Sequence, residues 1–170
     1  MRFLTLPNGL SISRVVLAAP TVWALLHDRA ALTIGLFVIV IASDLMDGRI
    51  ARQRQDVSPI GTLLDHGSDA VFVVALCAAG AWLALLPIAL PVLIACAFVH
   101  YAFDSRGLGG KPRGSRLGRW NGIAYFVIVG LLIAVHHLAT NAMLDSALYG
   151  LGWLLAVTTV MSIVLRTLRL

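Results

Sequence analysis

The sequence predicts an all-α integral membrane protein with six transmembrane helices. Of its 170 residues, 59% are hydrophobic and only 12% are charged, and the mean hydropathy is +0.91. This composition is typical of membrane proteins and argues against a soluble domain. A spanning helix needs about 20 mostly apolar residues. We place six such segments at residues 10–27, 31–54, 60–83, 84–103, 118–138 and 144–168.

Polar residues and prolines mark the first four segments in order. Asn8 and Ser11 precede or open the first segment, where such residues are typical of helix starts. The second segment turns polar only in its last turns, and Pro59 separates it from the third. Pro87 and Pro91 indicate an uncharged bend at the start of the fourth.

Polar residues mark both ends of the fifth segment. Residues 103–121 are rich in glycine and cations and predict a loop before it. His136 and His137 lie at its other end. Because they are adjacent, they do not share a helix face as ligands four residues apart would, and we expect interface residues without function. Since little of the chain is left over, we expect one membrane domain over residues 1–170.

The cations predict the orientation of the chain, because short cytoplasmic loops collect Lys and Arg. Only Arg29 of the 13 cations falls on the outer side if both termini are cytoplasmic. The cations needed for this orientation account for the net charge of +5, so a nucleic-acid partner is not needed to explain it. The sequence also has no basic stripe with interleaved aromatic residues. The inner cations are Arg2, Arg14, Arg49, Arg52, Arg54, Arg106, Lys111, Arg113, Arg116, Arg119, Arg166 and Arg169.

Four carboxylates interrupt the second and third segments. Asp44 and Asp47 share one face of a helix, and Asp65 and Asp69 share a face of the next, because a helix has 3.6 residues per turn. A short turn near residues 55–59 makes the two helices antiparallel. All four carboxylates can therefore meet at one depth in the membrane.

Such a meeting requires compensating positive charge. One Asp near the centre of a spanning helix costs about 2.5–3.5 kcal/mol on insertion scales, and neighbouring negative charges repel one another. Carboxylates without Cys or suitably spaced His select hard cations, which here means Mg²⁺ or Mn²⁺. Four carboxylates can hold two ions about 3.5–4 Å apart, the arrangement used for displacement at phosphorus.

The neighbouring residues favour a phosphate ligand. Gly48 and Gly61 leave room for a bulky group to approach the backbone, and Arg52 can offer a bidentate fork to a phosphate. The residues thus favour a site for a metal-chelated pyrophosphate. As an alternative, the Asp residues would only cap helix ends or pair with nearby arginines, which accounts poorly for four carboxylates on two facing helices.

The spacing of these residues resembles the signature of the CDP-alcohol phosphotransferase family. Every signature position is filled, and residues 7–14, PNGLSISR, also resemble the start of the family's first helix. The signature positions are Asp44, Asp47, Gly48, Ala51, Arg52, Gly61, Asp65 and Asp69.

The resemblance implies a membrane enzyme of phospholipid synthesis. It would transfer a phosphatidyl group from a CDP-linked lipid, usually CDP-diacylglycerol, to an alcohol hydroxyl and release CMP. Asp44, Asp47 and Asp65 would hold the two metal ions, and Asp69 would contribute to the second ion and act as general base. The resemblance also implies a homodimer, and we expect a bacterial-type inner membrane with the active site facing the cytoplasm. The cytidine and pyrophosphate would be bordered by Gly48, Ala51, Arg52 and Gly61.

The acceptor is less defined by the sequence. Cations near residues 106–119 could hold a phosphorylated acceptor such as glycerol 3-phosphate, with Arg116 and Arg119 as the preferred pair, or they could serve only as topology determinants. His66 and Ala70 stand where phosphatidylglycerophosphate synthases usually have Pro and Lys, so inositol phosphate, serine and phosphatidylglycerol stay open as acceptors. A divalent-cation transporter is the alternative class, and it predicts carboxylates spread through the membrane depth.

Overall fold

The structure is a computed structural model, and it describes most of the chain. Its backbone description covers residues 6–54, 59–107, 116–139 and 141–168. Its side-chain description covers residues 12–45, 61, 63–104, 116–139 and 141–168.

All regular elements in the described residues are α-helices, which confirms the predicted all-α class. Each of the six helices overlaps one of the six predicted segments. They are α1 (Leu6–Leu26), α2 (Ala30–Arg54), α3 (Pro59–Trp82), α4 (Ala89–Gly107), α5 (Arg116–Leu138) and α6 (Ala142–Thr167).

The boundaries of α4 differ from the prediction of residues 84–103. The N–H groups of Leu85 and Leu86 both donate to the carbonyl oxygen of Gly80, at 2.9 and 3.1 Å, and Ala84 adopts a φ of 58°. This turn closes α3 and delays the start of α4 until Ala89. At its other end α4 continues to Gly107. Residues 103–107 are therefore helical and do not belong to the predicted loop.

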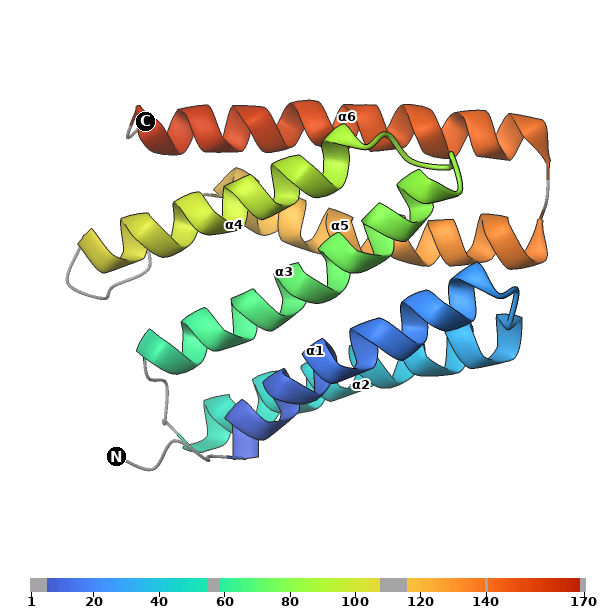
Figure 1. Cartoon of the computed structure of the whole chain (residues 1–170). Coiled ribbons are helices and arrows are strands. Elements are labelled where there is room, and N and C mark those ends of the chain that lie inside the picture. Colours follow the sequence, from blue (N-terminus) through green and yellow to red (C-terminus); the bar gives the residue numbers. More distant parts are fainter. Residues whose placement is uncertain (1–5, 55–58, 108–115, 140, 169–170) are drawn as a thin grey trace.

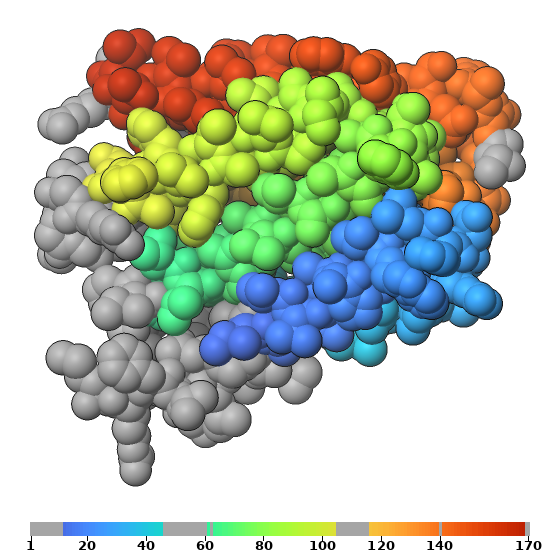
Figure 2. Space-filling view, in the orientation of Figure 1, coloured from blue at the N-terminus to red at the C-terminus, as the bar shows by residue number. Residues whose placement is uncertain are grey.

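The helices form an elongated bundle in which α3 lies between α1 and α4 (Figure 1). The α1–α2 pair covers one side, and α5 and α6 pack together on the other. On one face the side chains of α1, α3 and α4 close directly against one another (Figure 2). The start of α1 and the end of α6 lie at the same end of the bundle.

Aromatic and aliphatic side chains of α3 form the centre of the bundle. Phe72 is fully buried, and its ring lies 6.4 Å from that of Phe37 on α2 and 6.3 Å from that of Phe126 on α5. Many large apolar side chains on the outer surface are exposed instead, such as Trp82 at 84%. An apolar exterior around a buried core is the distribution that a lipid environment favours.

Three described helical stretches are long and apolar enough to cross a membrane, and the others are shorter. The long ones are Leu63–Trp82, Arg116–Leu138 and Ala142–Thr167. The shorter apolar helices, counted over described residues only, are Ile12–Leu26, Ala30–Leu45 and Ala89–Asp104.

The contact between α6 and the start of α4 gives a first test of the fold. A Cβ atom on Gly152 would lie 2.5 Å from Cδ of Pro87, whose ring cannot move aside easily. We expect Gly152→Ala to destabilise the protein by about 1–3 kcal/mol through overpacking, measured as a lower melting temperature in detergent.

Gly150 provides the matched control on the same helix. A Cβ there meets nothing within 4 Å, so Gly150→Ala should leave the melting temperature unchanged or raise it through better helix propensity. Equal stability of the two variants would contradict the close approach of Pro87 to α6.

Candidate active site

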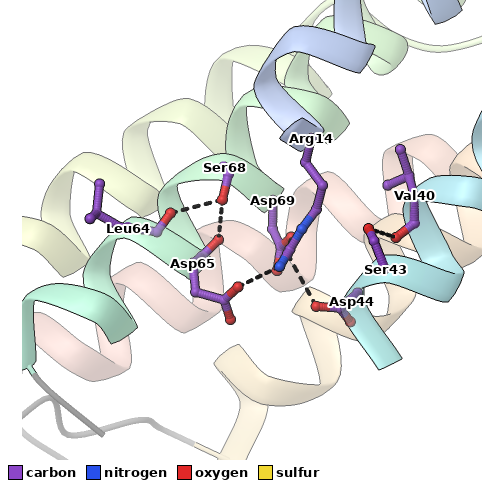
Figure 3. Close-up of polar contacts among 8 residues, drawn as sticks. All are labelled: Arg14, Val40, Ser43, Asp44, Leu64, Asp65, Ser68 and Asp69. Atoms are coloured by element: carbon purple, nitrogen blue, oxygen red, sulfur yellow. Dashed lines mark hydrogen bonds and ion pairs between the residues drawn. The ribbon is translucent and has the colours of Figure 1, made fainter. Parts of the chain in front are cut away.

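Three of the four predicted carboxylates meet around one arginine (Figure 3). Arg14 on α1 places Nη1 3.1 Å from Oδ1 of Asp44 on α2. Its Nη2 atom donates to Oδ1 of Asp65 on α3 at 2.6 Å, and Nη1 also donates to Asp69, one turn further along α3. The guanidinium therefore links α1 to the carboxylates of α2 and α3.

Burial divides this cluster into an inner cation and a more open set of anions. The side chain of Arg14 is 0% exposed, whereas those of Asp44, Asp65 and Asp69 are 43%, 38% and 22% exposed. Three ionised carboxylates against one guanidinium leave two negative charges uncompensated within the cluster. The negative charge on the open side of the cluster therefore favours the binding of further cations.

Serine hydroxyls beside the cluster are satisfied by their own helices. Ser43 donates to the carbonyl oxygen of Val40 at 2.8 Å, and Ser68 donates to those of Leu64 and Asp65 at 2.8 and 2.9 Å. Each hydroxyl takes up a helical carbonyl, as is common for Ser within helices. In these hydrogen bonds neither hydroxyl takes up a carboxylate oxygen of the cluster.

The prediction that the carboxylates share one depth is confirmed for Asp44, Asp65 and Asp69. Asp47 lies in the part of α2 whose side chains are outside the described residues, together with Gly48, Ala51 and Arg52. Gly61 lies in the first turn of α3.

Arg14 was not predicted as a site residue; the sequence places it among the inner cations and in the stretch, residues 7–14, that resembles the family's first helix. The available signal was a cation within an apolar helix, which requires a counter-ion from another helix. Its partners Asp65 and Asp69 lie 51 and 55 residues away in the sequence, so no local pattern connects them.

The donor atoms fit a hard divalent cation. Asp65, His66 and Asp69 each offer one ligand atom, and these atoms all lie within 4.8 Å of one another. Carboxylate oxygens are the ligands that Mg²⁺ and Mn²⁺ prefer. His66 is an additional nitrogen donor that the sequence analysis did not propose. Its ring stands edge-on to Tyr101 of α4, with 5.6 Å between the ring centroids.

A cavity of about 540 Å³ opens beside the carboxylates. Asp44 and Asp69 line it together with Arg119 of α5 and Arg166 of α6, and much of its wall is apolar, as at Phe126. This volume lies within the range of small-molecule sites. The combination of anions, cations and apolar walls suits a ligand that is part phosphate and part lipid.

Several polar residues of this cavity were not proposed from the sequence. Asn121 is 5% exposed, and its Nδ2 atom has no hydrogen-bond partner among the described residues. The guanidinium of Arg166 lies 4.9 Å above the ring of Tyr101. Of the two exposed arginines predicted to hold the acceptor, Arg119 lines the cavity and Arg116 is not among the residues that line it.

Comparison with known families identifies the chain. Residues 4–167 match the CDP-alcohol phosphatidyltransferase family. The chain belongs to this family. The match spans α1 through α6 and includes the carboxylate cluster, and it confirms the resemblance of the signature. Members of the family are membrane-bound transferases of phospholipid synthesis that use divalent metal ions.

Relatives in this family include several cardiolipin synthases. The cardiolipin synthase (CMP-forming) of Streptomyces coelicolor is 29% identical over 99 residues, which cover 55% of this chain and 46% of that protein. The human cardiolipin synthase (CMP-forming) is 30% identical over 91 residues, covering 53% of this chain and 30% of that protein.

A third relative is more similar over a shorter stretch. The putative cardiolipin synthase of Mycobacterium tuberculosis is 36% identical over 74 residues, which cover 43% of this chain and 35% of that protein. The aligned part thus spans less than half the length of each of these relatives. No solved structure gives a significant match to the chain.

Replacing Arg14 tests its role in holding the carboxylates together. In Arg14→Met the three carboxylates lose their shared cation, and removing one partner of a buried ion pair destabilises by up to about 3–5 kcal/mol. We expect a lower melting temperature with metal chelated and partial recovery in excess Mg²⁺, because the ion supplies the missing charge.

Arg119→Met is the matched control, because Arg119 is exposed and should contribute little to stability. If Arg14→Met were as stable as the wild-type protein in chelator, Arg14 would not be the counter-ion of this cluster.

Proposed function

We propose that the protein transfers a phosphatidyl group from CDP-diacylglycerol to a lipid hydroxyl and releases CMP. The observation that carries this proposal is the convergence of Asp44, Asp65 and Asp69 beside a partly apolar cavity. Family membership supports the reaction class, and the carboxylates support chemistry at a metal-bound pyrophosphate.

In this proposal the signature carboxylates hold two Mg²⁺ or Mn²⁺ ions. Asp44, Asp47 and Asp65 would be the principal ligands, and Asp69 would contribute to the second ion. Bound there, the ions would neutralise the pyrophosphate and the charge that develops on the departing CMP. Gly61 would admit the nucleotide beside α3, together with Gly48, Ala51 and Arg52 of α2.

Asp69 is the proposed general base. Its side chain is the most buried of the three described carboxylates, and it lines the cavity. The acceptor hydroxyl would lose its proton to Asp69 as its oxygen attacks the phosphatidyl phosphorus. A new P–O bond then forms, and the bond from phosphorus to the bridging pyrophosphate oxygen breaks, so that CMP carries away that electron pair.

The proposed acceptor is phosphatidylglycerol. A CMP-forming synthesis of cardiolipin, the product in the names of the relatives, requires an acceptor that is itself a phospholipid with a free glycerol hydroxyl. The apolar walls of the cavity and Arg119 and Arg166 within it suit such a lipid phosphate. Glycerol 3-phosphate, the acceptor favoured from the sequence, is the first alternative, followed by inositol phosphate and serine.

We also propose that all six helices span the membrane with both termini and the active site on the cytoplasmic side. The distribution of the cations supports this orientation. Asp65 and Asp69 lie in the first half of α3, which begins at the end of the bundle where α1 starts and α6 ends. A homodimer in a bacterial-type inner membrane stays a prediction. No observation favours a cation transporter, because the described carboxylates of the site are gathered towards one end.

The reaction can be tested directly with purified protein, CDP-diacylglycerol and Mg²⁺ or Mn²⁺. We expect CMP release with phosphatidylglycerol, and loss of activity in chelator. Asp69→Asn should lower the rate by at least about a hundredfold, because a general base contributes about 10²–10⁴. The variant should stay folded, because Asp44 and Asp65 still pair with Arg14.

The same assay separates the acceptors. CMP release with glycerol 3-phosphate, inositol phosphate or serine, and none with phosphatidylglycerol, would overturn the proposed acceptor and keep the reaction. Absence of CMP release with all four would overturn the reaction itself.

The two arginines near the start of α5 give a second test. Because Arg119 lines the cavity and Arg116 does not, Arg119→Met should raise the KM of the acceptor at least about tenfold, as expected for a lost charged hydrogen bond. Arg116→Met should have a smaller effect, and both variants should keep the KM of CDP-diacylglycerol. Equal KM values for the acceptor in the two variants would remove Arg119 from the acceptor site.

A further inference from the structure

A second group of metal-ligating side chains lies at the opposite end of the bundle. Asp28 belongs to the turn between α1 and α2, and His136 and His137 belong to the last turn of α5. One donor atom from each residue lies within 4.8 Å of the other two. Figure 1 shows this turn beside the end of α5. Asp28 lies about 20 Å from Arg14 along the chain direction, given the rise of a helix.

The geometry of the three side chains is close to that of a zinc site. Oδ1 of Asp28 is 2.9 Å from Nε2 of His136, and the rings of His136 and His137 are 4.7 Å apart at 63°. Ligand atoms around a tetrahedral Zn²⁺ stand about 3.3 Å from one another, because the bonds are about 2.0–2.1 Å long. Small side-chain movements would therefore bring all three donors onto one ion.

The two histidines also carry buried nitrogen atoms without aligned partners. Nε2 of His136 and Nε2 of His137 are shielded from solvent, and neither makes a well-directed hydrogen bond within the described residues, although Asp28 approaches the first closely. A buried polar atom without a partner has a free-energy cost for the folded protein. A cation that accepts both nitrogen lone pairs would remove this cost.

Asp28 is held in a tight turn that leaves its carboxylate open to solvent. Its φ is 56°, a left-handed conformation that Asp tolerates better than most residues. The N–H of Arg29 donates to the carbonyl oxygen of Ala24 at 2.9 Å and closes this turn. Because the Asp28 side chain is 81% exposed, a metal ion has a path to the site and a water can complete its coordination.

The donor set differs in kind from that of the candidate active site. Two imidazoles and one carboxylate prefer Zn²⁺ and similar cations, whereas the active-site donors, which are mostly carboxylates with His66 as one imidazole, prefer Mg²⁺ or Mn²⁺. We propose that Asp28, His136 and His137 form a second metal site that binds Zn²⁺ or a similar imidazole-preferring cation. An ion there ties the α1–α2 turn to the end of α5. This site is independent of the proposed transferase activity.

His27 provides a matched control within the same turn. Its Nδ1 atom lies 2.9 Å from the carbonyl oxygen of Trp23, and its ring stacks on that of Trp23 at 4.7 Å. His27 is not a member of the cluster of donor atoms. Replacing His27 therefore removes an imidazole from this turn without removing a proposed metal ligand.

The test is a titration of the full chain in detergent with Co²⁺, whose visible absorption reports tetrahedral nitrogen and oxygen ligands. Excess Mg²⁺ is added to compete for the acidic site, and the titration is repeated in an Asp69→Asn variant, which removes one donor of that site while Asp44 and Asp65 still pair with Arg14. We expect the absorption bands in both proteins and in His27→Gln, their displacement by Zn²⁺, and a rise of the melting temperature with Zn²⁺.

Variants of two of the three ligands, Asp28 and His137, decide the proposal. Even a residue that only hydrogen-bonds to a metal ligand contributes about 10–100-fold to affinity, so Asp28→Asn and His137→Gln should each weaken Co²⁺ binding by more than about tenfold. Melting temperatures in chelator show whether each variant is folded. If His137→Gln does not fold, the more conservative variant Asp28→Asn still tests the site. Absence of the bands in the wild-type protein, or unchanged affinity in a folded Asp28→Asn variant, would overturn the site and leave only an ion pair.

Discussion

Arg14 is fully buried, yet its guanidinium contacts carboxylates on two other helices. A lone arginine in an apolar bundle would be strongly unfavourable, and so would three carboxylates facing one another. Each set of charges therefore requires the other. This mutual requirement fixes α1, α2 and α3 in register, because Asp44, Asp65 and Asp69 can reach the guanidinium only when the three helices are aligned at that depth.

The rest of the bundle positions this cluster beside a cavity. The ring of Phe72 lies between those of Phe37 and Phe126, so α3 is held against α2 and α5 just above the carboxylates. At the level of the site, the helices α4, α5 and α6 bring Tyr101, Arg119 and Arg166 to the cavity wall. The apolar contacts thus determine where the helices lie, and the ion pairs determine their rotation.

Much of this arrangement follows from the sequence. The helices are predictable because each is a long apolar run between polar or proline-containing breaks. The antiparallel second and third helices also predict that Asp44 and Asp65 lie near one another, and in the structure Arg14 of α1 joins them. Arg14 could not be placed in the same way, because its partners are distant in the chain. Asp28 and His137 were missed for a related reason: helical spacing describes ligands on one helix, whereas this cluster joins a turn to a different helix.

The position of Arg14 on the first helix has a consequence for biogenesis. Its partners Asp65 and Asp69 follow 51 and 55 residues later, which at about 5–20 residues per second means a delay of about 3–10 s during synthesis. Throughout that time the first helix carries a cation whose insertion alone costs about 2.5–3.5 kcal/mol. In the proposed six-span topology, pairing of Arg14 with Asp65 and Asp69 would favour entry of the first and third helices into the bilayer as one neutralised unit.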